Sequence, residues 1–367
     1  GARDAVLRFR LFGLLILVFF FAAAITLVPL HFLTTMRSSE FISYMGIGRS
    51  DIRIDIRQSG ESAERFNDAV SRIAADEEVD RFAVLTTSTF TLHRDNRQRE
   101  SFDVETGDLT QFPLDYLRGA APTAHDQIAL SYLNSEELGK DLGDTLTLSA
   151  ATGPSRKLKV VGIYQDITDG GRTAKATFPH NEQSIVARTV SLDLVAGVSE
   201  EAKVAEYGAL LDDARVTNLE GYLSQTLGNT ISQLGTVTGG AFGLALIVSV
   251  LITSLFFRML IAKDAQRIAI MRSIGFPKRA IRLQYLTSAV LLLLAGIGGG
   301  VGFSNTLGQR LVSLLWSFMG AARIEFAIDP LQAYIVMPAA LVVAVAITTL
   351  AVLSRIQDRS ISKSIAG

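Results

Sequence analysis

The residue types that most often carry out chemistry are sparse in this sequence, and their spacing fits no metal site or catalytic site. The chain has no cysteine, which excludes a disulfide framework and a thiolate metal site. Its four histidines lack the i, i+4 pairing of a zinc-binding HExxH helix, so we interpret them as ordinary surface or core residues. There is no GxSxG motif either, so a membrane-anchored hydrolase is a weak alternative that would need acidic residues brought together by folding.

Two glycine-rich stretches raise the question of phosphate binding. They are GGAFG at 239–243 and GIGGGVG at 296–302. Neither is followed by Lys-Ser or Lys-Thr, and GxxxxGK[ST] occurs nowhere in the sequence, so we expect no P-loop in this chain. Both stretches lie in apolar sequence, where small residues four positions apart let helices approach closely. We therefore predict helix-packing roles for Gly239, Gly243, Gly296 and Gly300.

A basic, amphipathic segment, RIAIMRSIGFPKRAIRL at 267–283, lies between two apolar runs. Its residues Ile268, Met271 and Ile274 share helical spacing and form one apolar stripe. Gly275 then favours a helix end, and Pro277 favours the start of a new helix. The pattern predicts a helix, a sharp break and a second helix, which together form a rigid elbow. A helix lying flat among lipid headgroups is the alternative for this composition.

Four apolar windows are long enough to cross a bilayer, whose core of about 30 Å needs roughly 20 helical residues. The first window is longer than the apolar part of a signal peptide, although basic residues precede it. We predict transmembrane helices at 11–33, 237–261, 283–306 and 333–354.

The placement of Lys and Arg predicts the orientation, because cytoplasmic flanks of membrane helices are enriched in these residues. Basic residues cluster in the N-terminal flank 1–10, in the segment 262–282 and in the tail 355–367. We expect these three segments, and with them both termini, in the cytoplasm. The long segment 34–236 and the short connection 307–332 are then expected on the outer side of the cell membrane.

The segment 34–236 has the composition of a water-soluble α/β domain. SDIRIDIRQ at 50–58 alternates isoleucine with charged residues, at the period of a half-buried strand. A helical pattern and a β-branched run follow, and the same strand, helix, strand order returns near the end of the segment. Between these two units, turn signals and short β runs predict an inserted β-rich lobe at about 123–183. The Gly- and Thr-rich loop at 169–183 favours disorder over a binding finger.

The predicted fold class is therefore an α+β membrane protein. It has four transmembrane helices and a large α/β extracytoplasmic domain between the first and the second of them. That domain contains two strand-helix-strand units and the inserted lobe.

Three motifs resemble the MacB/FtsX/LolC-type ABC transporter permeases, the FtsX-like permease family. LGKDLGDTLTL at 138–148 and KVVGIYQD at 159–166 are similar to parts of that family's extracytoplasmic domain, and RSIGFPKR at 272–279 is similar to its cytoplasmic segment. Family members commonly have a Glu near the start of the cytoplasmic segment, where this chain has only Asp264 as an acidic residue. The opening GARDAVLRFR, without Met, resembles the start of one half of a longer two-unit permease.

The resemblance implies that the elbow is a coupling segment, which docks in a groove of an ATP-binding subunit. Met271, Ile274 and Phe276 are then expected to fill that groove, while basic residues bind its acidic rim or lipid phosphate. The residues with this implied role are Arg267, Met271, Arg272, Ile274, Gly275, Phe276, Pro277, Lys278 and Arg279.

The resemblance also implies that ATP and Mg²⁺ bind to a dimer of ABC-type ATPase subunits on separate chains. This chain would bind no cofactor and would be no enzyme by itself. ATPase motion would move the extracytoplasmic domain (mechanotransmission) and so export or extract a lipoprotein, peptide or other envelope substrate. The alternative is an FtsX-like regulator of a cell-wall hydrolase or sensor kinase, with no transported cargo.

Four helices enclose little by themselves, so a second permease unit is expected. It would come from a homodimer, a heterodimer or the other half of the same polypeptide. The other expected partners are the lipid bilayer of the bacterial cytoplasmic membrane and an adaptor, lipoprotein, hydrolase or kinase outside it. A formal net charge of -1 argues against nucleic-acid binding, which needs a concentrated basic face.

Overall fold

A computed structural model describes residues 2–57, 62–93, 99–149, 155–179, 185–211 and 214–364. The chain separates into two units. The helical unit comprises Gly1–Met36, Asn229–Leu311 and Glu325–Gly367. The sheet unit comprises Arg37–Gly228 and Val312–Ile324. The basic flanks predicted at 1–10 and 355–367 lie outside the side chains that the structure describes.

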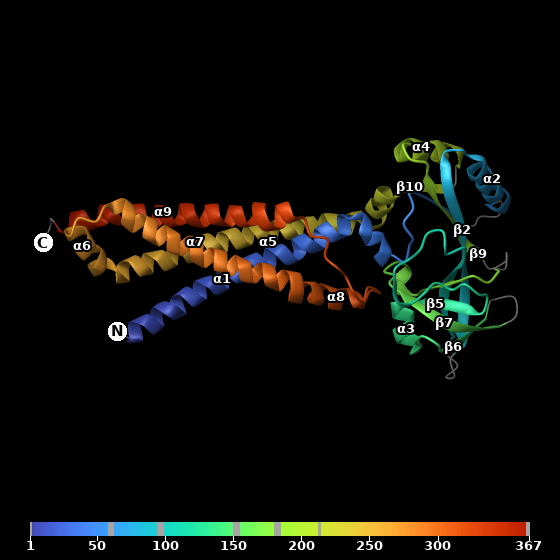
Figure 1. Cartoon of the computed structure of the whole chain (residues 1–367), viewed down its shortest axis with the longest axis horizontal. Helices are drawn as coiled ribbons and strands as arrows, with labels where there is room; N and C mark the ends of the chain where they lie inside the picture. Colours follow the sequence, from blue (N-terminus) through green and yellow to red (C-terminus); the bar gives the residue numbers. More distant parts are fainter. Residues whose placement is uncertain are drawn as a thin grey trace. The chain divides into compact units, whose positions relative to one another are not determined.

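The helical unit is a bundle in which α1, α5, α7 and α9 run side by side (Figure 1). Its elements are α1 (Ala2–Arg37), most of α5 (Leu219–Lys263), α6 (Ala265–Ser273), α7 (Lys278–Phe303), the π-helical turns η4 (Ser304–Gly308) and η5 (Gln332–Val336), and α9 (Met337–Ser364). Helix α8 (Gln309–Ser317) begins in this unit and ends in the sheet unit. All four long helices contribute to one apolar core, through residues such as Phe19, Phe257, Leu293 and Val345. Because the described side chains of these helices are mostly apolar, the bundle can pack in lipid as well as on itself.

Within the described residues, four helices are long and apolar enough to cross a membrane. They are Phe12–Arg37, Leu219–Lys263, Lys278–Ser317 and Gln332–Ser354. The third is longer than the predicted 283–306, because the π-helical turn η4 continues the helix into α8 instead of ending it. The second includes the polar stretch before residue 237, so α5 is one helix of 45 residues and about 67 Å.

The sheet unit is built on one ten-stranded sheet in its described residues. The strand order is β10-β1-β9-β2-β3-β8-β5-β7-β4, with β6 paired to β2 and β7. The strands are β1 (Ile52–Arg57), β2 (Val79–His93), β3 (Arg99–Gly107), β4 (Tyr116–Gly119), β5 (Gln127–Ser131), β6 (Thr145–Ser149), β7 (Arg156–Tyr164), β8 (Thr173–Ala176), β9 (Ile185–Leu194) and β10 (Ala214–Asn218). The helices are η1 (Ser39–Tyr44), α2 (Ser62–Ala75), α3 (Tyr132–Leu138), η2 (Asp169–Gly171) and α4 (Glu200–Leu210).

The predicted fold class is confirmed. Strand β1, helix α2 and strand β2 form one strand-helix-strand unit, and β9, α4 and β10 form the other. Their shared core buries Ile52, Ile54 and Ile56, so the alternation in the sequence does place one face of β1 inside. The opposite face of β1 carries Arg53 and Asp55.

The inserted lobe has wider limits than the predicted 123–183. Its apolar core also contains Phe90 and Leu92 from the end of β2 and Val104 from β3. The reason is the length of β2, whose 15 residues pair with β9 near one end and with β6 near the other. The lobe is therefore an extension of the same sheet. The disorder favoured for 169–183 is wrong for Thr173–Ala176, which forms β8, while 180–183 lies outside the described residues.

Candidate functional site

The predicted elbow is present at the junction of α6 and α7. Gly275 has a φ of +94°, in the left-handed region that glycine tolerates best. The backbone N–H of Gly275 donates to the carbonyl oxygen of Arg272 at 3.1 Å, and that of Phe276 donates to Met271 at 3.1 Å. These two bonds are the Schellman pattern that ends a helix. Pro277 then precedes the first residue of α7, Lys278.

The base of the elbow is fixed by the one acidic residue of this segment. The Tyr285 hydroxyl on α7 donates a 3.0 Å hydrogen bond to a carboxylate oxygen of Asp264, which is only 6% exposed. Asp264 directly precedes α6, so the bond joins the start of α6 to the third turn of α7. The elbow is therefore held at its tip by backbone bonds and at its base by a side-chain bond.

The apolar side chains of the elbow divide into two groups. Ile268 and Met271 are half-buried against the bundle core. Ile270, Ile274 and Phe276 are 54%, 71% and 54% exposed. Met271 was predicted to fill the ATPase groove together with Ile274 and Phe276. In the structure it is half-buried against its own bundle, one helical turn from Ile268. Ile270, which the sequence reasoning missed, is the exposed residue one turn before Ile274.

Basic residues surround these exposed apolar side chains. Arg267, Arg272, Lys278 and Arg279 are all exposed. The elbow thus presents an apolar surface, Ile270, Ile274 and Phe276, with cationic side chains on both sides of it in the sequence. We call this set of seven residues the elbow surface.

The four predicted packing glycines differ in their surroundings. A Cβ atom on Gly296 would lie 2.5 Å from Cβ of Phe19, and one on Gly300 would lie 2.6 Å from Cβ of Ala23. These two glycines therefore face α1 at a separation that no larger residue permits. A Cβ atom on Gly239 or Gly243 would meet nothing within 4 Å among the described residues.

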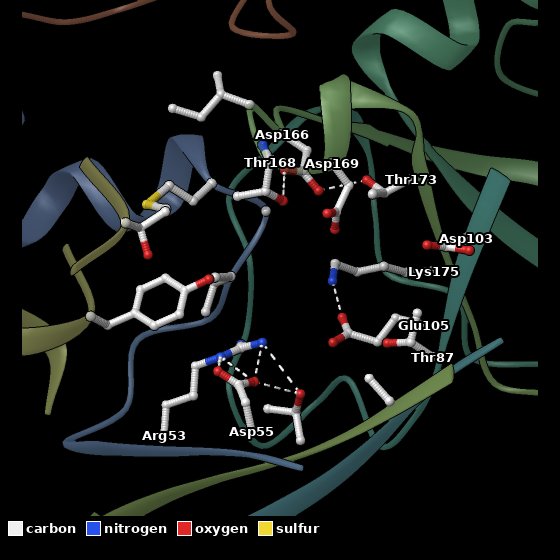
Figure 2. Close-up of a pocket in the computed structure, with 18 of the residues that line it drawn as sticks. Arg53, Asp55, Thr87, Asp103, Glu105, Asp166, Thr168, Asp169, Thr173 and Lys175 are labelled. Atoms are coloured by element: carbon white, nitrogen blue, oxygen red, sulfur yellow. Dashed lines mark hydrogen bonds and ion pairs between the residues drawn. The ribbon is translucent and has the colours of Figure 1, made fainter. Parts of the chain in front are cut away.

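A cavity of about 1030 Å³ opens in the sheet unit, and no sequence motif pointed to it. Figure 2 shows its lining, in which charged side chains from several strands point toward one space. The contributing elements are β1, β2, β3, β8, β9, β10, the residues after η1, the turn between β7 and β8, and the start of α5. The cavity lies where the polar face of β1 meets the inserted lobe.

Two basic side chains of the cavity are held by carboxylates. Arg53 Nε donates to both carboxylate oxygens of Asp55, at 2.9 and 3.1 Å, and its guanidinium lies 5.1 Å from the ring centre of Tyr222. Lys175 Nζ forms an ion pair with Glu105, its register partner on the neighbouring parallel strand. Both ion pairs are largely shielded from solvent, which strengthens the attraction within each pair.

A third carboxylate, Asp166, is 3% exposed. Burial raises its pKa to about 6, although hydrogen bonds from Thr168 and Thr173 and the nearby charge of Lys175 oppose that rise. The Thr168 N–H and hydroxyl donate to Oδ1 at 2.8 and 2.6 Å, and the Thr173 hydroxyl donates to Oδ2 at 2.5 Å. Asp166 therefore has a fixed position and a proton affinity near neutral pH.

Two further carboxylates, those of Asp103 and Asp169, border the cavity. Asp103 on β3 accepts a 2.6 Å hydrogen bond from the Thr89 hydroxyl. Asp169 has a φ of +48° and carries its carboxylate into the space above Lys175 in Figure 2. Burial raises the pKa of Asp169, and the negative charges of Asp103 and Glu105 raise it further, while the positive charge of Arg53 opposes the rise. Side chains of both signs therefore act on the Asp169 carboxylate.

The family comparison concerns mainly the helical unit. Residues 239–358 match the FtsX-like permease C-terminal family. They form an FtsX-like permease domain. The FtsX-like part of the resemblance predicted from the sequence is confirmed over these residues. A sequence comparison with curated proteins finds no match.

Solved structures resemble about half of the chain at low identity. The periplasmic region of MacB from Actinobacillus actinomycetemcomitans has 15% identity and a TM-score of 0.34, over 50% of this chain and 95% of that one. A putative permease domain from Porphyromonas gingivalis has 15% identity and a TM-score of 0.29, over 46% and 90%. The extracellular domain of the transporter YknZ from Gram-positive bacteria has 12% identity and a TM-score of 0.31, over 46% and 100%.

The FtsX-like permease domain contains the elbow surface and the glycines at 296 and 300, but none of the residues that line the cavity. The two candidate sites are thus of different kinds. The elbow surface is a protruding apolar and basic area suited to another protein or to lipid. The cavity is lined by both charged and apolar side chains and has a size suited to a small molecule.

Proposed function

We propose that this chain is the membrane subunit of an ATP-driven transporter and that its elbow surface docks on a separate ABC-type ATPase. The observation that carries the proposal is the exposure of Ile270, Ile274 and Phe276 within a family-matched permease domain. Interfaces concentrate their energy in a few apolar or aromatic anchors, and arginine is enriched beside them. The elbow surface has this composition.

The rigidity of the elbow supports a role in transmitting force. Its tip is fixed by the backbone bonds of Gly275 and Phe276, and its base is fixed by the bond between Tyr285 and Asp264. A flexible loop would absorb a displacement of the ATPase, whereas this elbow passes it to α7. Helix α7 continues through η4 into α8, so the displacement travels along 40 helical residues.

In this proposal the elbow lies in the cytoplasm, with both chain termini, and the sheet unit lies outside. ATP and Mg²⁺ bind to the ATPase dimer and not to this chain. Closure of the dimer shifts the helices, which in turn move the sheet unit against an envelope substrate such as a lipoprotein or a peptide. A second permease unit completes the assembly, because two ATPases offer two docking grooves.

The docking is tested by co-purification of the permease with candidate ABC ATPases from the same organism, from membranes solubilised in mild detergent. Ile274→Asp and Phe276→Ala should each lower retention of the ATPase by about 30-fold or more, the effect of losing an interface anchor of about 2 kcal/mol. Leu210→Asp is the matched control, because Leu210 is 49% exposed on α4 of the sheet unit. Unchanged retention in both elbow variants would show that the ATPase docks elsewhere.

A second pair of variants tests which helix face docks. Ile270→Ala should weaken ATPase retention, because its side chain is exposed beside Ile274. Met271→Ala should lower the thermal stability of the bundle but leave retention largely intact, since Met271 packs against the core. The reverse result would show that Met271, and not Ile270, belongs to the docking surface.

A further inference from the structure

The cavity of the sheet unit has more acidic than basic side chains. Its five carboxylates and three basic groups come from different parts of the sequence. The acidic residues are Asp55, Asp103, Glu105, Asp166 and Asp169, and the basic residues are Arg53, Lys175 and Arg215. When all are ionised, the lining therefore carries an excess of two negative charges.

Two of the three basic side chains are paired with carboxylates of the same lining. Arg53 is paired with Asp55, and Lys175 is paired with Glu105. Arg215 donates through Nε to the side-chain oxygen of Gln225 at 2.7 Å. Asp103 and Asp169 form no ion pair with any residue that the structure describes. Two carboxylates thus border the cavity with capacity for a cationic partner.

The backbone holds one of these carboxylates in place. Asp169 lies in the turn between β7 and β8 with a left-handed φ of +48°, which side-chain-bearing residues rarely adopt. In Figure 2 its carboxylate points into the same space as Lys175. Such a conformation costs free energy and persists where the surrounding structure imposes it.

The size of the cavity decides what kind of cation it fits. The described residues contain no group of three or more His, Cys, Asp or Glu side chains arranged to hold a metal ion. A volume of about 1030 Å³ is at the upper end of small-molecule sites and far exceeds one hydrated ion. An ammonium group donates up to three hydrogen bonds, which Asp103, Asp169 and the threonine hydroxyls of the lining can accept.

We propose that this cavity binds a small organic cation with more than one ammonium group, held by Asp103 and Asp169. The proposal does not depend on docking of an ATPase, because binding is measured on the permease alone and without nucleotide. Failure of one proposal therefore leaves the other unaffected.

The experiment uses the full chain in nanodiscs of phosphatidylcholine, a lipid without net charge, and spermidine as the probe. Isothermal titration calorimetry at low salt should show saturable binding. Asp169→Asn and Asp103→Asn should each raise the Kd by about 3- to 10-fold, because each removes one carboxylate charge from the lining without changing side-chain size. Asp169→Glu should restore most of the affinity.

The matched control is Asp68→Asn. Asp68 is an exposed carboxylate on α2, paired with Arg72 and outside the cavity. This variant has the same loss of charge and should bind spermidine as wild type does. Fluorescence of Trp316, which lies in the sheet unit, checks that every variant unfolds at the wild-type temperature.

Three results would overturn the proposal. One is the absence of saturable spermidine binding by the wild-type chain. Another is an unchanged Kd in the Asp103→Asn, Asp169→Asn double variant, which would place the probe elsewhere. The third is equal binding of triacetylspermidine, or displacement of spermidine by Mg²⁺ at the same ionic strength, because either would remove the role of the ammonium groups.

Discussion

The backbone N–H of Arg323 donates a 2.7 Å hydrogen bond to Oε1 of Gln165, although 158 positions separate the two residues. Gln165 directly follows β7 and is 9% exposed. The next residue, Asp166, donates its own N–H to the carbonyl oxygen of Gly320 at 3.4 Å. The connection predicted at 307–332 is therefore not a simple outer loop. Part of it, 312–324, belongs to the sheet unit.

This junction predicts a large cost for a methyl group at Gly320. Gly320 has a φ of +106°, and a Cβ there would overlap the carbonyl oxygen of Asp166. We expect Gly320→Ala to lower the free energy of unfolding of the sheet unit by about 2 kcal/mol or more, because steric overlap adds to backbone strain. Trp316 is the only tryptophan of the chain, and its ring lies 6.3 Å from that of Phe41, so its fluorescence reports unfolding here.

Gly197→Ala is the control for the glycine substitution. Gly197 has a φ of +96°, but a Cβ there would meet nothing within 4 Å of the described chain. Gly197→Ala should lower the free energy of unfolding only by the conformational strain, about 1 kcal/mol. Equal losses in the two variants would mean that the contact between Gly320 and Asp166 contributes nothing.

The buried Asp166 predicts a pH dependence with a defined sign. Its pKa is raised to about 6, mainly by burial, from 3.8. The folded chain then holds this proton more tightly than the unfolded chain, so the stabilisation is complete below pH 3.8 and is lost as the pH rises through about 6. The loss is about 3 kcal/mol at most.

Asp166→Asn removes this titration. The difference in unfolding temperature between wild type and variant, followed by Trp316 fluorescence, should shift in favour of the variant as the pH rises from 4 to 7. Taking the difference cancels groups such as Asp76, whose pKa is lowered to about 2 by hydrogen bonds from Lys203 and Tyr207 despite some desolvation. A difference that stays constant over this range would mean that Asp166 titrates normally.

The two faces of α7 predict opposite responses to added methyl groups. Gly296→Ala should destabilise the bundle by about 1–3 kcal/mol, because its Cβ would lie 2.5 Å from Cβ of Phe19 on α1. Gly298→Ala on the same helix should be neutral or slightly stabilising, since its Cβ would meet nothing within 4 Å of the described chain. The measurement is the fraction of detergent-solubilised protein that stays monodisperse after heating. Equal behaviour of the two variants would contradict the close approach of α1 and α7.

The proposed orientation can be tested cleanly, because the chain has no cysteine of its own. Ser273→Cys on the elbow and Ser71→Cys on α2 each introduce one exposed thiol. A membrane-impermeant maleimide added to intact spheroplasts should label Ser71→Cys at once and Ser273→Cys only after permeabilisation. Labelling of both thiols before permeabilisation would place the elbow and the sheet unit on the same side of the membrane.

The parts of the fold that the sequence predicted depend on local pattern. The alternation of Ile52, Ile54 and Ile56 predicted a half-buried strand, and β1 buries all three side chains. Gly275 and Pro277 predicted a helix break, which the backbone shows. In each case a few neighbouring residues determine the outcome by backbone sterics or periodicity.

The parts that could not be predicted depend on contacts between distant segments. Met271 and Ile270 are equally apolar, and only the packing of α6 against its bundle decides which of them is exposed. The cavity needs the parallel pairing of β3 with β8, which places Glu105 opposite Lys175 across 70 positions. No motif encodes such a pairing, because its register is set by the whole sheet.

The chain passes from one unit to the other four times, and the hydrogen bond between Gln165 and Arg323 lies just before the last of these passages. The residues after α8 are therefore attached to the end of β7 by two hydrogen bonds within the sheet unit. Gly320 accepts one of them three residues after α8, and its donor Asp166 lies in the same turn as Asp169. A ligand bound beside this turn would contact residues that are themselves bonded to the segment leading into the last membrane-length helix.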